Sequence, residues 1–180
     1  MKKLILIGGV LASGKSTYSM ILKEKFKINV INKDRLKEIL GDNICVKNRD
    51  ENKKLSVICF DLMKYLVFTN ESVLVLECNF KDYELIELKK IVDKLNYEVL
   101  SIVFDAKNEI LHERFLKRLN ENRHYVHKSQ DFTNIEDFIK TQDELRNAPY
   151  FGNIINVNCD DFSYQDDSLL LQQIDEFIKK

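Results

Sequence analysis

Residues 9–16 read Gly-Val-Leu-Ala-Ser-Gly-Lys-Ser, a G-x-x-x-x-G-K-S pattern that follows an apolar run at residues 4–7. In this pattern the glycines allow a tight turn whose backbone N–H groups point inward at a polyphosphate, and the next helix adds its positive dipole end. Lys15 would carry a mobile positive charge to the β- and γ-phosphates, and the Ser16 hydroxyl would bind Mg²⁺. The spacing therefore predicts a site for a nucleoside triphosphate. The residues expected to contact its phosphates lie in or beside this loop: Gly9, Ala12, Ser13, Gly14, Lys15, Ser16 and Thr17.

A signal peptide is the alternative explanation of this segment, because Lys2 and Lys3 precede an apolar stretch. Gly8 and Gly9 interrupt that stretch, and no A-x-A cleavage site follows it. A signal peptide also gives no reason for the Gly-Lys-Ser-Thr at residues 14–17. The phosphate-binding loop explains the segment better.

Composition indicates an ordinary globular protein, with 180 residues, 44% hydrophobic residues and a formal net charge of −1. No apolar run reaches the length of a membrane span, so we expect no membrane association. The near-neutral charge gives no overall field to attract nucleic acid. The four cysteines are scattered without a C-x-x-C pair, which favours reduced thiols and a cytoplasmic protein. These are Cys45, Cys59, Cys78 and Cys159.

Strand-like apolar runs alternate with helical patterns along the whole chain. Strands are expected at 3–7, 28–31, 73–76, 98–104 and 154–157, and helices at 15–27, 33–40, 51–68, 82–95, 107–121, 134–146 and 168–179. This order predicts a three-layer α/β/α fold of the P-loop NTPase type, with a five-stranded parallel sheet and a helical lid, in one domain over 1–180. The inward side chains expected on the first and third helices are Met20, Ile21, Phe26, Leu55, Ile58, Cys59, Leu62 and Leu66.

Two acidic residues stand where strands are expected to end. Asp34 follows the second strand and Glu77 the third, and ligands of parallel sheets bind beyond the carboxyl ends of the strands. Glu77 is therefore a candidate for orienting Mg²⁺, and Asp34 for accepting a proton from an acceptor hydroxyl. The alternatives are that Asp34 only caps the next helix and that Glu77 is a solvated turn residue.

A basic cluster extends from the helix at 107–121 into the polar residues after it. Its members are His112, Arg114, Lys117, Arg118, Arg123, His124, His127 and Lys128. Arg114 and Arg118 are spaced i, i+4 and repel each other on one helix face, which an anionic ligand would offset. We predict a movable clamp in which Arg118 and Arg123 are catalytic and Arg114 binds the nucleotide, within a lid over about 114–133.

The segment around Arg123 is polar and offers little apolar surface to hold it down, so the three arginines are expected to lie far from phosphate in an open form. The alternative is an ordinary solvated face with Glu113 and Glu121 as partners. The spacing of the three histidines does not fit a metal site.

Four segments together resemble the small P-loop kinases of the polynucleotide-kinase and zeta-toxin type, within the nucleoside-monophosphate-kinase-like group. They are residues 9–17, 31–34, 77–80 and 113–124, with a weaker echo at 154–160, where such kinases place a loop beside the adenine. The resemblance implies ATP as the nucleotide, an acid at Asp34 that activates the acceptor hydroxyl, and lid arginines that contact phosphates. Family members commonly place an arginine three residues after that acid, whereas this chain has Lys37 there.

The sequence thus predicts an ATP- and Mg²⁺-dependent kinase that acts on a hydroxyl or phosphate of a small molecule. One alternative is a polynucleotide or RNA 5′-kinase, in which residues 112–128 form a strand-binding groove. The other is a nucleotide-dependent ATPase or switch that acts through a protein partner. The sequence identifies neither the acceptor nor an oligomeric state.

Overall fold

Strands and helices alternate along the chain in the computed structural model, which describes residues 2–119, 121, 123–127 and 134–179. The strands are β1 (Lys3–Gly9), β2 (Asn29–Asn32), β3 (Val73–Glu77), β4 (Glu98–Asp105) and β5 (Asn153–Asn158). The α-helices are α1 (Lys15–Phe26), α2 (Lys33–Asn43), α3 (Arg49–Thr69), α4 (Asp82–Lys94), α5 (Asn108–Leu119), α6 (Ile135–Arg146) and α7 (Ser168–Lys179). Two short 3₁₀ helices are η1 (Tyr125–His127) and η2 (Ser163–Asp166).

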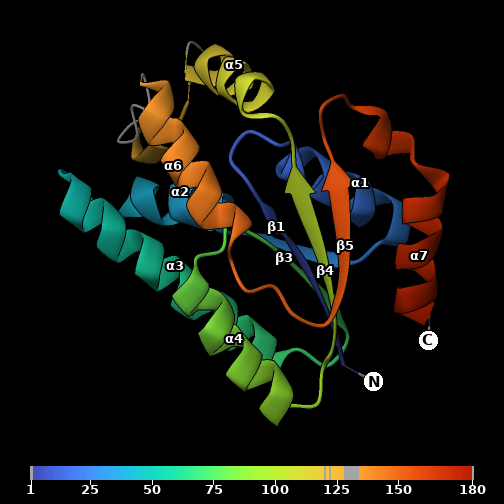
Figure 1. The fold of residues 1–180 in the computed structure, drawn as a ribbon. Coiled ribbons are helices and arrows are strands. Elements are labelled where there is room, and N and C mark those ends of the chain that lie inside the picture. The colour runs from blue at the N-terminus through green and yellow to red at the C-terminus, as the bar shows by residue number, and fades with distance from the viewer. Residues whose placement is uncertain (1, 120, 122, 128–133, 180) are drawn as a thin grey trace.

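The five strands form one parallel sheet in the order β2-β3-β1-β4-β5, which confirms the predicted fold class (Figure 1). Because β2, β3 and β1 are neighbours in a parallel sheet, their carboxyl ends lie side by side at the same end of the sheet. The register pairs Asn32 with Glu77 and Ile7 with Glu77, so the loop after β1 opens beside both. The sheet therefore positions the phosphate-binding loop next to the predicted acid at the end of β3.

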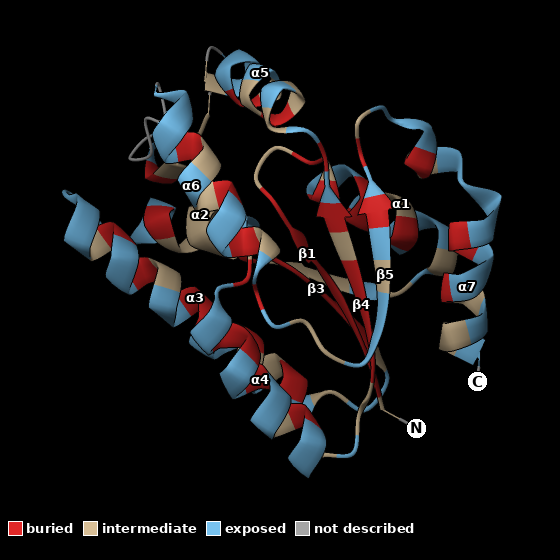
Figure 2. Cartoon of the chain, viewed as in Figure 1, coloured by how far each residue is buried: buried red, intermediate tan, exposed pale blue. Residues whose placement is uncertain are grey.

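Helices cover both faces of the sheet, which gives the three layers. Ile5 and Ile7 of β1 pack in one core with side chains of α1, α5, α6 and α7. Leu4 and Leu6 point to the other face and pack with α3 and α4. This alternation is the period of two of a strand buried on both sides. Figure 2 shows β1 and β3 buried in the centre while the helices carry exposed outer faces.

The helices form where they are predicted, and two of them bury a partly different set of side chains. In α1 the predicted Ile21 and Phe26 pack partly buried against the core, whereas Met20 is exposed. The fully buried apolar residues of α1 are Tyr18 and Leu22. In α3 the expected Ile58 and Leu62 are exposed. The buried apolar residues of α3 are Leu55, Cys59, Phe60, Met63 and Val67, of which Leu55 and Cys59 were predicted. The predicted Leu66 packs partly buried against the core. The α3 sequence is apolar on most of its circumference, so the sheet rather than the pattern decides which face it covers.

No helix in the described part of the chain combines the length and the apolar character that a membrane crossing requires.

Candidate active site

The phosphate-binding loop joins β1 to α1 in a backbone conformation that requires glycine at two points. Gly9 has a φ of 113°, and a Cβ there would lie 2.1 Å from the carbonyl oxygen of Phe104. Gly14 has a φ of 89° and directly precedes α1, where a Cβ would lie 2.1 Å from the hydroxyl of Tyr164. Any side chain at either position would both strain the backbone and clash. The loop thus holds its predicted turn at the amino end of α1.

Lys15 folds back into this loop. Its Nζ donates to the carbonyl oxygen of Val10 and to the Ser13 hydroxyl, the latter at 3.1 Å. Burial lowers the pKa of Lys15 to about 8, although the nearby Glu77 and Asp34 oppose the shift. A buried ammonium that has lost its water gains strongly from an incoming anion. The loop therefore offers a phosphate the positive charge of Lys15 and backbone N–H groups that have no acceptor within the described structure.

Glu77 lies at the end of β3 beside the loop. Its Oε2 accepts from the Asn32 side-chain amide and, at 3.2 Å, from the Ser16 hydroxyl. Burial raises the pKa of Glu77 to about 7, while Lys15 counteracts the rise. Glu77 is 6% exposed, so the alternative of a solvated turn residue is wrong. The paired hydroxyl and carboxylate oxygens are the hard ligands that Mg²⁺ takes alongside water and phosphate oxygens.

Asp34 lies in the first turn of α2 but does not cap it. The N-cap residue is Asn32, whose Oδ1 accepts from the backbone N–H of Arg35 at 2.7 Å. Asp34 is exposed and lines a cleft beside the loop. The helix-cap alternative for Asp34 is therefore wrong, and its carboxylate faces open space.

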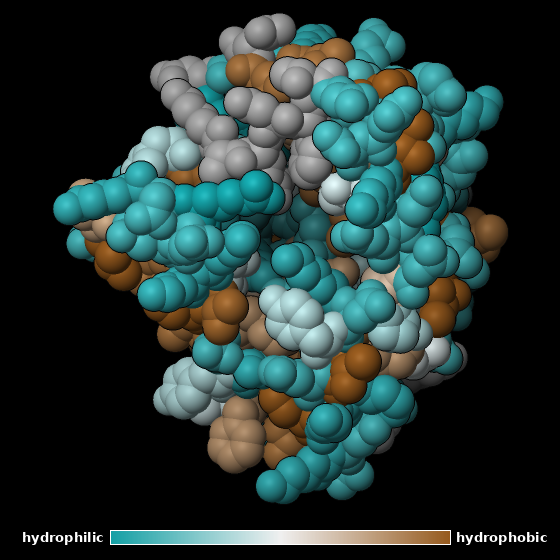
Figure 3. All heavy atoms as spheres, turned by 60° about the vertical axis from the view of Figure 1, so that its left-hand side comes forward, coloured by the Kyte–Doolittle hydropathy of each residue, from teal (hydrophilic) through white to brown (hydrophobic). Residues whose placement is uncertain are grey.

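This cleft has a volume of about 640 Å³ and lies between α1, β2, α2, Arg118 and residues 123–127. Its lining comprises Ser16, Ser19, Met20, Lys23, Val30, Ile31, Asn32, Asp34, Arg35, Leu36, Glu38, Arg118, Arg123, His124 and His127. One end adjoins the phosphate-binding loop through Ser16. The molecule is turned in Figure 3 so that the α2 and α3 side comes forward, and hydrophilic side chains dominate the middle of that face. The cleft can hold a polar molecule next to the end of a bound polyphosphate.

The structure brings two of the three predicted arginines to this cleft. Arg118 and Arg123 both line it, and neither forms a salt bridge with the described residues. Burial lowers the pKa of Arg123, and the neighbouring Arg118 lowers it further. Two such cations side by side favour an anion between them. Their placement fits a clamp on transferring phosphate.

Arg114 lies elsewhere. Its guanidinium donates to the carbonyl oxygens of Cys159 at 2.6 Å and Asp160 at 3.1 Å, in the loop after β5. It also lies over the Phe162 ring, 4.5 Å from the centroid. Arg114 is thus not gathered with Arg118 and Arg123, and it contacts the segment that the sequence associates with the adenine.

Residues 123–127 are docked on α2 and α3, so the expectation of a segment with little to hold it down is wrong. Val126 is buried in a small core with Leu55 and Cys59 of α3. The Asn52 side-chain amide donates to the Val126 carbonyl oxygen at 2.9 Å, and the Tyr125 hydroxyl donates to the Gly41 carbonyl oxygen. Val126 supplies the apolar contact of this segment, which its polar composition does not indicate.

Two histidines reinforce this docking. His124 Nε2 lies 2.9 Å from Asp42 Oδ1, and His127 Nε2 lies 3.1 Å from Glu38 Oε1. Burial lowers the pKa of His127, and Arg123 nearby lowers it further. Within the described residues no group of three or more potential ligands is arranged for a metal ion. Both histidines therefore pair with carboxylates of α2.

Replacement of Gly41 by alanine should undock this segment without unfolding α2. The new Cβ would lie 2.6 Å from Val126 Cγ1, whereas alanine favours the helix itself by about 1 kcal/mol. We expect an unchanged or higher melting temperature and roughly fivefold faster tryptic cleavage after Arg123, which corresponds to about 1 kcal/mol of lost docking. Mass spectrometry of the digest measures this. Ile39→Ala, at an exposed position of the same helix, is the control, and equal cleavage of both variants would contradict the docking.

Part of the predicted lid, about 114–133, lies outside the described residues. These are residues 120, 122 and 128–133, which include Asn122 and Lys128. Sequence reasoning missed Asn32 and Gln142, because a single amide residue carries no pattern. For Asn32 the available signal was its position directly before a helix, where asparagine is a preferred cap.

A protein-family model described as an AAA domain matches residues 5–137, which is more than half of the chain. No curated protein matches the sequence.

Solved structures of small kinases have the same fold. A candidate kinase from Chloroflexus aurantiacus is similar with a TM-score of 0.80 at 19% identity, over 98% of each chain. Shikimate kinase from Aquifex aeolicus is similar with a TM-score of 0.61 at 15% identity, over 96% of each chain. A gluconokinase from Sinorhizobium meliloti has a TM-score of 0.58 at 14% identity, over 99% of this chain and 90% of that one. At these identities the similarity establishes the fold alone.

Proposed function

The chain belongs to the AAA_18 family of AAA-domain P-loop proteins, and from this premise we propose that it is a kinase. It transfers the γ-phosphate of ATP, with Mg²⁺, to a hydroxyl or phosphate of a small molecule. The solved kinases with this fold support phosphoryl transfer as the reaction. The four sequence segments described above support a closer relation to the polynucleotide-kinase and zeta-toxin type. We further propose one domain over 1–180 with its lid at about 114–133, and the four free cysteines support a cytoplasmic location.

One observation carries the proposal: a single cleft adjoins the phosphate-binding loop and contains an exposed carboxylate and two arginines that form no salt bridge with the described residues. Ser16 of the phosphate-binding motif lines this cleft together with Asp34, Arg118 and Arg123. Phosphoryl transfer needs an acceptor in line with the γ-phosphate and positive charge on the equatorial oxygens. A protein that only bound a nucleotide would not need an exposed carboxylate such as that of Asp34 in this cleft.

The nucleotide side is built from the loop and its lysine. The backbone N–H groups of residues 12–17 have no acceptor within the described structure and are free for phosphate oxygens. Lys15 exchanges its carbonyl partner for the β- and γ-phosphates. Ser16 and Glu77 would hold Mg²⁺, which supplies positive charge to the phosphate oxygens when bound.

On the acceptor side, Asp34 holds the acceptor hydroxyl in line and takes its proton. The hydroxyl oxygen bonds to the γ-phosphorus as the bond from that phosphorus to the bridging oxygen breaks, and ADP leaves. Arg118 and Arg123 neutralise the charge that spreads over the transferring group. Where the acceptor is a phosphate, its oxygen attacks directly and Asp34 has no proton to accept.

Removal of either cleft arginine should slow turnover much more than it weakens ATP binding. We expect Arg118→Ala and Arg123→Ala each to reduce kcat by about 10²-fold, because such contacts strengthen in the transition state. The measurements are acceptor-dependent turnover and the Kd for ATP. Lys117→Ala, an exposed lysine on the same helix, serves as the control. Near-normal turnover in both arginine variants would show that these arginines are ordinary solvated surface residues.

A screen for acceptor-dependent ADP release tests the function as a whole. The panel contains small hydroxyl compounds, small phosphate esters and short oligonucleotides with 5′-hydroxyl ends. Stimulation by a small molecule supports the proposal. Stimulation by oligonucleotides alone, with steep salt dependence, would instead identify a polynucleotide kinase. Slow ADP release that no acceptor changes would indicate an ATPase or switch.

A further inference from the structure

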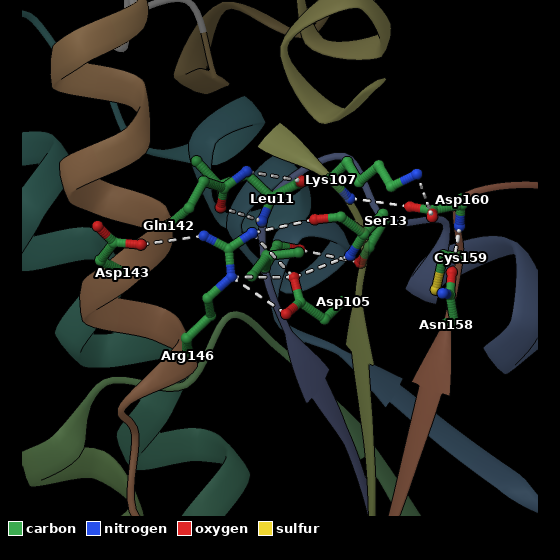
Figure 4. Close-up of polar contacts among 12 residues, drawn as sticks. Leu11, Ser13, Asp105, Lys107, Gln142, Asp143, Arg146, Asn158, Cys159 and Asp160 are labelled. Atoms are coloured by element: carbon green, nitrogen blue, oxygen red, sulfur yellow. Dashed lines mark hydrogen bonds and ion pairs between the residues drawn. The ribbon is translucent and has the colours of Figure 1, made fainter. Parts of the chain in front are cut away.

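Gln142 of α6 is bonded reciprocally to the phosphate-binding loop. Its Oε1 accepts from the backbone N–H of Leu11 at 2.8 Å, and its Nε2 donates to the Leu11 carbonyl oxygen at 3.1 Å. The side chain is fully buried, at 0% exposure. Figure 4 shows it reaching from α6 to Leu11. An amide that satisfies both backbone groups of one residue fixes the position and the orientation of that peptide.

The loop divides its backbone donors into two sets. Toward the protein, Gly9 N–H donates to the Tyr150 hydroxyl at 2.7 Å and Val10 N–H to the Phe104 carbonyl oxygen at 3.1 Å. The Leu11 N–H, which donates to Gln142 Oε1, completes this set. The donors of residues 12–17, directly after Leu11, have no acceptor within the described structure. Gln142 thus holds the residue at which the loop changes from protein-bound to free donors.

The next residue shows why a firm hold matters. Ala12 has a φ of 61°, a left-handed conformation that costs a residue with a side chain about 1 kcal/mol or more. Such a conformation persists only where neighbouring contacts fix it. The Gln142 amide supplies that contact directly before Ala12.

The same face of α6 connects the loop to two other parts of the site. One turn before Gln142, Phe138 packs on Phe115 of α5, with ring centroids 5.4 Å apart. One turn after it, Arg146 binds the Asp105 carboxylate at the end of β4, with Nε 3.1 Å from both oxygens (Figure 4). α6 is therefore anchored to the sheet and to the helix that carries Arg118.

We propose that Gln142 is a positioning residue for nucleotide binding: its amide clamps Leu11 so that the N–H groups of residues 12–17 converge on the phosphates. This inference rests on the proposed ATP binding. Gln142 is fully buried and bonded to Leu11, so its side chain is not placed to touch a phosphate. It acts through the backbone of the loop.

The test compares ATP affinity among variants that are fully folded at the assay temperature. Gln142→Met keeps the length of the side chain but removes both hydrogen bonds, and we expect its Kd for Mg·ATP to rise about tenfold. Leu145→Ala is the matched control, because it removes a buried side chain of the same helix that forms no hydrogen bond with the loop. It should lower the melting temperature and leave the Kd unchanged. Equal Kd values for both variants would overturn the inference.

Amide hydrogen exchange of the wild-type protein tests the clamp even if Gln142→Met does not fold. Without ATP, the Leu11 amide should exchange slowly and the amides of residues 12–17 rapidly, and ATP should slow the second set. Fast exchange at Leu11 would overturn the clamp. If the wild type did not bind ATP, the proposed function would be contradicted. If the wild type bound ATP tightly and Gln142→Met bound it equally well, only this inference would be overturned.

Discussion

Lys15→Ala should abolish acceptor-dependent ADP production, with a loss of ~10³-fold or more, and should leave the fold intact. The buried ammonium is bonded within the loop, and no other described lysine lies there to replace it. Because burial lowers the pKa of Lys15, the folded state carries this charge at a cost that alanine removes. The variant should therefore melt no lower than the wild type.

Turnover, ATP affinity and thermal melting of Lys15→Ala are to be compared with those of Lys25→Ala. Lys25 is an exposed lysine in the last turn of the same helix, so its loss changes the charge equally without touching the loop. A well-folded Lys15→Ala protein that still produced ADP at the wild-type rate would refute the assignment of the loop.

Asp34→Asn should reduce phosphoryl transfer to a hydroxyl by about 10²–10⁴-fold while Mg·ATP still binds. Asparagine keeps the shape of the side chain but cannot accept the proton. Because Asn32 caps α2, the change removes no cap, and the melting temperature should stay within the range of a surface substitution. Single-turnover kinetics with a responsive acceptor and calorimetric titration with Mg·ATP measure the two effects.

Asp82→Asn is the matched control for this substitution, since Asp82 is an exposed acid in the first turn of α4. It should leave both transfer and binding unchanged. Full transfer by Asp34→Asn would remove Asp34 from the reaction. If the responsive acceptor were a phosphate ester, a small effect would be expected, so the acceptor screen has to come first.

The order and type of the elements could be predicted from the sequence because each apolar run has the period of its element. β3, for example, is a continuous apolar run that ends in the acid Glu77, and the structure has it at Val73–Glu77. The parallel direction of the strands follows from the helical crossovers between them. The glycine-rich loop could be predicted because its spacing is dictated by the geometry of a phosphate.

What the sequence could not supply depends on contacts between distant segments. The inward face of α3 is decided by the sheet that it covers, because the exposed Ile58 is at least as apolar as the buried Met63. Arg114 shares a helix face with Arg118 in the sequence pattern, yet the loop after β5 holds its guanidinium. The docking of Val126 depends on a core that α3 provides. In each case a local pattern leaves two outcomes open, and tertiary packing selects one.

The backbone of the phosphate-binding loop is completed by residues that a ribosome would synthesise long after it. Tyr150 reaches back across 141 positions to Gly9, and Gln142 across 131 to Leu11. A nascent chain that has only its first hundred residues therefore carries the whole sequence motif without the partners that shape it. Contacts of such sequence separation form late in folding because a long loop must close first. The ability to bind a nucleotide should thus appear only after Gln142 and Tyr150 have been synthesised, when Asp34, Arg118 and Arg123 on the acceptor side are already part of the chain.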